Sequence, residues 1–409
     1  MNLFKISFAN IKEKKLNSFL SALLLALGIG MISLLLLLNQ QLDEQFRKNI
    51  KGIDMVVGAK GSPLQLILSS IYQIDAPTGN VPLAEVNSLR KNPFVKTVIP
   101  LSMGDSYQGF RIVGTTPKYI EHYNVKIAEG HIHNASMEVT VGSKVARNAG
   151  LKIGDTFASS HGLDGEGDQH DHKKYKVTGV FAASGSVVDQ LILTRLSSIW
   201  DIHEHAEAGE KKHESDHHEA DGAESEEEGQ DVTSALIQFR NPMGLMTIPR
   251  QVNTNTSMQA ALPSIEINRL FSLLGVGIET LRAIALVIIT IAGVSVFVSL
   301  YNSLKERKYE MALMLSMGAT RTSLFLMLLI EGLFLAIIGF LAGIILSRVG
   351  LLLFSKAAEQ DFHYSLGKFA ILPEEIYLLF AALAVGAVAA ALPSIGIYRL
   401  NISRTLAEE

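Results

Sequence analysis

The chain has 409 residues, 48% of them hydrophobic and many gathered into long runs, which excludes an ordinary soluble protein. No cysteine is present, so disulfides, thiolate zinc sites and cysteine nucleophiles are excluded. The net charge of −4 hides an acidic stretch between residues 201 and 230, where twelve acidic residues stand against two lysines, so the rest of the chain is mildly basic.

The N-terminal residues predict an interfacial helix followed by a first membrane span. Between Asn2 and Leu16, apolar side chains are interspersed with four lysines, which is typical of an amphipathic helix at a membrane surface. Ser18 to Leu38 then carries no charge, and a helix of this length reaches about 30 Å, enough to cross a bilayer. A cleaved signal peptide is the alternative, but the run is too long and lacks a small-residue cleavage site, so we expect a retained helix.

Three further apolar runs predict membrane spans at Ala283–Leu300, Leu324–Leu346 and Ile376–Leu392. Lysine and arginine gather before the first span, between the second and third, and after the fourth. The positive-inside rule then places both termini and the loop at 301–322 in the cytoplasm. Residues 39–282 are expected outside.

The outer region is expected to mix strands and helices. Segments rich in β-forming residues predict strands at Ile53–Gly58, Val95–Leu101 and Gly109–Gly114. Polar, helix-permissive residues predict that the first and second spans continue outward as stalks, over Gln40–Lys51 and Ile265–Arg282. The apolar segment Gly61–Tyr72 is too short to span a membrane, and it either packs in the core, lines a cavity or touches lipid.

The motifs of common enzymes are missing from this sequence. No G-x-x-x-x-G-K-[ST] segment is present to bind ATP phosphates, and neither H-E-x-x-H nor G-x-S-x-G occurs. Ser184–Ser186 is expected to be a loop and not a nucleophile turn. We therefore expect a non-catalytic protein.

Eight of the twelve histidines lie in two acid-rich stretches and are candidate metal ligands: His161, His170, His172, His203, His205, His213, His217 and His218. Imidazole and carboxylate suit zinc, copper, nickel or another divalent cation. The spacing does not define one tetrahedral site. The alternative is a solvated, disordered insertion at about 201–230 that binds metal only incidentally. No other cofactor is expected.

The stretch Ser303–Gly332, between the second and third spans, predicts a short helix at the membrane surface. It opens with a charged cluster and continues as a run of Ala, Leu and Met that breaks at Gly318 and restarts at Thr320, a good N-cap residue. Leu304, Met311 and Leu315 share one helix face. Such a helix can dock on another protein, whereas the alternative is a loop whose basic residues only follow the positive-inside rule.

This stretch resembles the signature of the FtsX/MacB-type (ABC3) ABC transporter permeases, roughly ERxxEIALLRALGATRxxLxxLxLxEG. The matching positions are Glu306, Arg307, Glu310, Met311, Ala312, Leu313, Met317, Gly318, Ala319, Thr320, Arg321, Glu331 and Gly332. The resemblance implies that the helix at 303–321 couples the permease to a separate or fused ATPase. The implied coupling residues are Lys305, Glu306, Arg307, Lys308, Glu310, Met317, Gly318, Ala319 and Thr320.

Other parts of the chain resemble the same family. The outer region matches the family's extracytoplasmic core at Gly130, Gly142, Ala146, Leu151, Gly154 and Asp155, with His131 in place of the family arginine. In the tail Pro393 and Arg399 match, while Ser403 departs. The small-residue face at 386–391 allows close helix packing.

The resemblance implies a membrane α plus extracytoplasmic α/β fold: four transmembrane helices, with a large mixed α/β domain inserted between the first and second. The implied domains are 1–39, an amphipathic elbow and first span; 40–280, a MacB-like core; and 281–409, an FtsX-like permease domain with three spans and the coupling helix.

The implied function is the permease subunit of an ABC-type complex in the bacterial inner membrane, with both termini cytoplasmic. It would transmit ATP-driven motion to the outer domain, for a cargo that is a lipoprotein, another amphiphile or metal-linked. The implied partners are an ABC ATPase, a second identical or paralogous permease, membrane lipid and an extracytoplasmic protein, with no nucleic acid. The alternative is a regulatory protein that controls an outer effector such as a cell-wall hydrolase and transports nothing.

Overall fold

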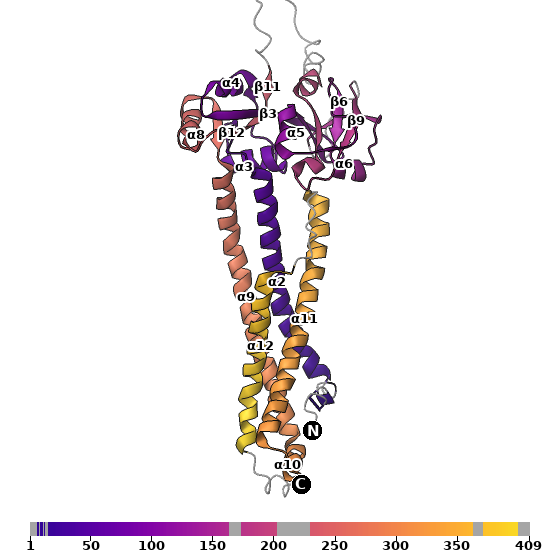
Figure 1. Cartoon of the computed structure of the whole chain (residues 1–409), viewed down its shortest axis with the longest axis vertical. Helices are drawn as coiled ribbons and strands as arrows, with labels where there is room; N and C mark the ends of the chain where they lie inside the picture. The colour runs from indigo at the N-terminus through magenta and orange to yellow at the C-terminus, as the bar shows by residue number, and fades with distance from the viewer. Residues whose placement is uncertain are drawn as a thin grey trace, which may run out of the picture. The chain divides into compact units, whose positions relative to one another are not determined.

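The computed structural model describes residues 6–7, 9–10, 12, 15–162, 173–202, 230–362 and 371–399. They belong to two units (Figure 1): a helical unit, Met1–Asp43 with Ser272–Glu409, and an α/β unit, Glu44–Phe271. Among the described residues, four helices are long and apolar enough to cross a membrane. A mixed α/β domain lies between the first and second of them, so the predicted fold class is confirmed.

The helical unit is built from α2 (Lys15–Ile50), α9 (Pro263–Glu306), α10 (Lys308–Ser316), α11 (Arg321–Phe362), α12 (Pro373–Ser394) and the 3₁₀ turn η5 (Ile395–Arg399). The helices α2 and α9 have 36 and 44 residues, and both exceed the roughly 20 residues that a bilayer needs. The C-terminal end of α2 and the N-terminal end of α9 belong to the α/β unit, so both helices continue beyond the predicted spans, as the predicted helical stalks require.

Small residues let the spanning helices approach closely. A Cβ atom on Gly332 of α11 would lie 2.5 Å from Ala390 Cβ and 2.8 Å from the Gly386 carbonyl oxygen of α12. Gly339, also on α11, meets α2 in the same way, since its Cβ would lie 2.8 Å from Leu25 Cβ. Helices in lipid associate through such close packing, because lipid tails are as apolar as their side chains. The predicted small-residue face of the fourth span is confirmed.

The α/β unit contains an eleven-stranded sheet with the strand order β13-β1-β12-β3-β4-β10-β6-β9-β5, to which β7 and β8 add at β9 and β3. Its strands are β1 (Met55–Ala59), β3 (Val95–Tyr107), β4 (Phe110–Thr115), β5 (Ile127–Gly130), β6 (Glu138–Val141), β7 (Thr156–Phe157), β8 (Ser160–His161), β9 (Tyr175–Phe181), β10 (Ile192–Arg195), β12 (Ser234–Phe239) and β13 (Met258–Ala261). The pairs β4/β10 and β6/β9 are parallel and the other pairs antiparallel. All three predicted strands are present.

Short helices cover this sheet, and β2 (Val81–Pro82) pairs with β11 (Asp231–Val232) in a second, small sheet. The short helices are α3 (Pro63–Ile67), the π-helical turn η1 (Leu68–Tyr72), α4 (Leu83–Ser88), η2 (Leu89–Lys91), α5 (Pro117–Tyr123), α6 (Ser143–Asn148), η3 (Val187–Gln190) and α8 (Met243–Asn255).

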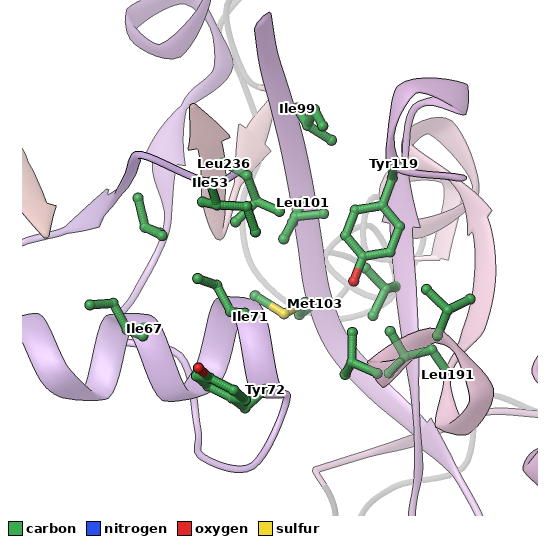
Figure 2. Packing of buried hydrophobic residues seen from close by; sticks show 14 of the residues in the cluster. Ile53, Ile67, Ile71, Tyr72, Ile99, Leu101, Met103, Tyr119, Leu191 and Leu236 are labelled. Carbon is green, nitrogen blue, oxygen red and sulfur yellow. The ribbon is translucent and has the colours of Figure 1, made fainter. Parts of the chain in front are cut away.

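The apolar segment 61–72 is part of the core of the α/β unit. It forms α3 and η1, and Ile67, Ile71 and Tyr72 are buried in one cluster with Leu101 and Met103 (Figure 2). Core packing, one of the three alternatives, is therefore what the structure shows for the buried face of this segment. The apolar side chains on its buried face are already covered by the sheet.

The α/β unit is expected to lose stability in mild acid because of His133. Burial lowers the pKa of this histidine to about 4, and its Nδ1 lies 3.0 Å from Thr140 Oγ1. Since the unfolded side chain titrates near 6.5, the unfolded state binds more protons between pH 6.5 and 4. Stability is complete above this window and falls by about 3 kcal/mol as the pH drops through it.

The single tryptophan, Trp200, lies in the α/β unit and reports its unfolding by fluorescence. Denaturant titrations of the purified full chain at pH 7.5 and pH 4.5 measure the free energy of unfolding at each pH. The difference between the two values should be smaller for His133→Gln than for the wild type. Glu138, whose pKa is lowered by backbone hydrogen bonds from Ala135 and Asn134, acts in the same direction and is common to both proteins. If the free energy of unfolding depended equally on pH in the two proteins, the assignment of the acid sensitivity to His133 would be contradicted.

Candidate functional site

The helix α10 lies in the segment that joins two spans, and its ends are set by local geometry. The backbone of Arg307 (φ −103°, ψ 19°) leaves the helical range and separates α9 from α10. After α10, Gly318 takes φ +97°, a conformation that glycine adopts without strain. Thr320 Oγ1 then accepts the Ser323 N–H at 3.2 Å and caps the start of α11. The predicted break and restart of the helix are confirmed.

The inner face of α10 is held by an apolar cluster. Its buried members are Leu304, Met311, Leu324, Met327, Leu328 and Ile397, and Ile6, Met314 and Leu315 pack against them. Ser7 Oγ donates to the Met327 carbonyl oxygen at 3.0 Å, and the Arg321 guanidinium donates to the Tyr398 carbonyl oxygen. The cluster packs α10 against α11, and the two hydrogen bonds fix α11 to the N-terminal segment and to η5. Met311 and Leu315 share the inner face of α10, as predicted. Leu304 was predicted to lie on the same helix face, but the backbone break at Arg307 places it on α9, and it meets them only in the cluster.

The outer face of α10 carries an exposed apolar stripe. Tyr309, Leu313 and Met317 are 43%, 45% and 81% exposed. Tyr309 and Leu313 lie on one side of α10, and Met317, the C-cap residue, follows at the same spacing of four. Charged side chains that are also exposed flank the stripe: Lys305, Glu306, Lys308 and Glu310. We call these seven residues the coupling face. An apolar stripe bordered by both signs of charge is suited to a groove on a folded protein partner.

The nine predicted coupling residues lie along one continuous segment. Lys305 and Glu306 end α9, Arg307 forms the junction, Lys308 and Glu310 start α10, and Met317, Gly318, Ala319 and Thr320 connect α10 to α11. Arg307 differs from its charged neighbours, because its side chain is only 11% exposed and its Nε lies 3.9 Å from Glu310 Oε2. Tyr309 and Leu313 were not among the predicted residues, although their four-residue spacing with Met317 is visible in the sequence.

The predicted metal ligands fall almost entirely outside the described residues. His161 lies on β8, where its backbone pairs with Asp105 of β3, and the other seven histidines lie in stretches that the structure does not describe. Within the described part of the chain, no group of three histidine, aspartate or glutamate side chains gathers as a metal site. Metal binding by the insertions stays a prediction.

A second feature lies in the α/β unit, where α2 and α9 end. The ring of Phe46 on α2 lies 4.5 Å from the Tyr72 ring and 5.6 Å from the Phe271 ring of α9. Tyr72 Oη also donates to the Phe46 carbonyl oxygen at 2.9 Å. The ends of both long helices therefore pack on one another and on the core of the unit.

A loop at 184–189 is hydrogen-bonded to the C-terminal end of α2. Lys48 Nζ donates to the carbonyl oxygens of Ser184 and Gly185 at 2.8 and 2.9 Å, and Asn49 Oδ1 accepts the Val187 N–H at 3.1 Å. Asp189 holds the loop by accepting the N–H groups of Ser184 and Gly185. We call Phe46–Asn49, Tyr72, 184–189 and Phe271 the helix-end socket. It ties α2 to the sheet by polar contacts as well as by packing.

Comparisons with known proteins identify two family models in the sequence. The model of the MacB-like periplasmic core domain matches residues 18–217, and that of the FtsX-like permease C-terminal matches residues 282–402. The search of the curated proteins finds no match.

Two solved structures are similar to part of the chain. The periplasmic region of MacB from Actinobacillus actinomycetemcomitans has 12% identity and a TM-score of 0.33, over 55% of this chain and 97% of that one. The extracellular domain of the noncanonic ABC-type transporter YknZ from Gram-positive bacteria has 10% identity and a TM-score of 0.29, over 50% of this chain and 98% of that one.

Proposed function

Since the chain belongs to the FtsX/MacB-type family of ABC transporter permeases, we propose that it couples ATP hydrolysis by a partner ATPase to motion of its α/β unit. The family is one of membrane subunits that are generally non-catalytic and that work with an ABC ATPase. ATP would therefore be hydrolysed by that partner, and this chain would transmit the resulting movement.

The coupling face is the observation that carries the proposal. Exposed apolar side chains on a helix cost free energy in water, so a stripe of three indicates a surface that a partner covers. The opposite side of α10 is fixed to α11 by the apolar cluster around Met311 and Leu328. A push on the coupling face would then move α11 together with α10.

The continuity of α2 and α9 supports the second half of the proposal. Each is one unbroken helix with residues in both units. The helix α2 ends in the helix-end socket, and α9, which begins at Pro263, contributes Phe271 to it. Helical connections are stiffer than flexible linkers, and this supports the inference that movement of a span reaches the α/β unit.

The test is to co-express the full chain with candidate ABC ATPases from the same genome and to reconstitute the complex in lipid. One ATPase should co-purify, and nucleotide should change hydrogen exchange at residues 44–50 and 184–190, which contain most of the helix-end socket. Glu306→Ala with Lys308→Ala should weaken the association, since both charges are exposed on the coupling face. The proposal would be refuted if no candidate ATPase associated with the chain. It would also be refuted if a complex formed but its hydrogen exchange did not change with nucleotide.

We also place the protein in the bacterial inner membrane, with both termini and α10 on the cytoplasmic side. The basic residues that flank the spans support this orientation. An identical or paralogous second permease, lipid and an outer partner protein complete the proposed assembly.

The cargo is proposed to be metal-linked, since the buried face of segment 61–72 packs in the core and the histidine-rich insertions offer metal ligands. Eight histidines among acidic residues are a donor set for divalent cations. Calorimetric titration of the full chain with Zn²⁺, Cu²⁺ and Ni²⁺ should show binding selective for one ion. Deletion of 163–172 and 203–229 should abolish it. Weak, unselective binding that survives deletion would leave the insertions without this role.

A further inference from the structure

A buried ion pair joins two of the spanning helices. Arg348 of α11 lies with its Nη2 2.9 Å from Glu375 Oε2 of α12, and the side chains are 15% and 4% exposed. Buried charges cost free energy unless they are paired and hydrogen-bonded, and such a pair can specify one arrangement of the helices that carry it. The pair therefore calls for a role beyond stability.

Glu375 is the centre of a larger network. Its Oε1 accepts the hydroxyl of Ser33 on α2 at 2.7 Å, and its Oε2 accepts the Leu372 N–H at 3.2 Å, which caps the start of α12. Ser347 Oγ lies 2.9 Å from Ser33 Oγ. One carboxylate thus holds three helices, α2, α11 and α12, at a single point.

The surroundings of this point are interchangeable apolar side chains. Leu37, Leu351 and Leu372 form the neighbouring cluster, with further leucines of α2 packed against it. Leucine surfaces can slide or rotate past one another at little cost, because each new position offers similar contacts. A buried polar contact has one satisfied arrangement, so it can specify the register of the helices.

The network shares one helix with the α10 cluster and another with the helix-end socket. Leu328, at the α10 cluster, and Arg348 are on the same helix, about 30 Å apart at 1.5 Å per residue. Ser33 and Lys48 are likewise both on α2, about 22 Å apart. The helix α11 thus contains both the α10 contact and Arg348, and α2 contains both Ser33 and Lys48.

We propose that Arg348, Glu375 and Ser33 are positioning residues that lock the register of the first span to the third and fourth, so that movement received at α10 reaches the α/β unit through α2. This inference rests on the proposed function. It assigns the transmission of movement from one helix to the next to one hydrogen-bonded ion pair and not to general packing of the spans.

The decisive variant is Ser33→Ala, which removes the contact of α2 and leaves the ion pair intact. Its matched control is Ser21→Ala, because Ser21 is a buried serine of the same helix whose Oγ lies 3.0 Å from Ser295 Oγ of α9. A second variant, Arg348→Met with Glu375→Leu, replaces the pair by apolar side chains of similar size, so that packing is preserved.

Each protein is reconstituted with its ATPase, and nucleotide-dependent hydrogen exchange is measured at residues 44–50 and 184–190. Ser33→Ala and the double variant should keep ATPase association and lower the nucleotide-dependent change at least about three-fold. Ser21→Ala should show the same nucleotide-dependent change in hydrogen exchange as the wild type, within experimental error. A purely structural role would lower thermal stability without altering the change in exchange per nucleotide bound.

The outcomes separate this inference from the proposed function. If the wild-type complex does not form or does not respond to nucleotide, the proposed function fails. If the wild type responds, and Ser33→Ala responds equally or Ser21→Ala loses as much as Ser33→Ala, the proposed function stands and the positioning role is overturned.

Discussion

Met317→Asp is expected to weaken association with the partner ATPase about ten-fold or more. Met317 is the most exposed residue of the apolar stripe, at 81%, so the substitution leaves the fold of α10 intact. In the complex, the new carboxylate would be buried against an apolar surface with no partner charge. Such a change at the centre of an interface costs about 2 kcal/mol or more.

The matched control is Met246→Asp on α8 of the α/β unit, where the methionine is 79% exposed. The two substitutions are the same in chemistry and in exposure. Pull-down of the ATPase by each purified variant, with thermal unfolding as a check of folding, separates a local interface from a general effect of charge. Equal retention of the ATPase by both variants would show that the coupling face is not the docking surface.

Alanine at Gly332 and alanine at Gly277 are expected to change stability in opposite directions. At Gly332 the new methyl would lie 2.8 Å from the Gly386 carbonyl oxygen, so the backbones of α11 and α12 must separate. Overpacking of this kind costs about 1–3 kcal/mol. At Gly277 of α9 nothing lies within 4 Å of the new methyl, and alanine favours the helix by about 1 kcal/mol.

Thermal unfolding of the two purified variants in the same detergent measures this difference. A lower midpoint for Gly332→Ala and an unchanged or higher midpoint for Gly277→Ala are the expected results. A harmless Gly332→Ala would mean that the close approach of α11 and α12 is not a source of stability in the helical unit.

The features predicted from the sequence are those encoded by short-range pattern. Uncharged runs of bilayer length predicted the spans, and segments rich in β-forming residues predicted strands such as Val95–Leu101. Gly318 and Thr320 marked the break before α11, because a left-handed turn and an N-cap each require particular residue types.

The features that were missed depend on residues far apart in the chain. Ser33 and Glu375 are separated by 342 positions, so no local pattern pairs them. The segment 61–72 has the same apolar composition whether it lines a cavity or fills a core, and only its neighbours in the folded unit decide. The stripe at Tyr309 and Leu313 was visible as a spacing, but its exposure depends on which face of α10 meets α11.

The most direct test of the coupling role uses the absence of cysteine from the chain. A single Met317→Cys variant is labelled with a thiol-reactive photo-crosslinker and irradiated in the reconstituted complex, with Met246→Cys as the control of equal exposure. An adduct of permease and ATPase formed from position 317 and not from 246 is the expected result. No adduct at 317 in a complex that has formed, or equal adducts at both positions, would contradict the assignment of α10 as the ATPase-docking helix.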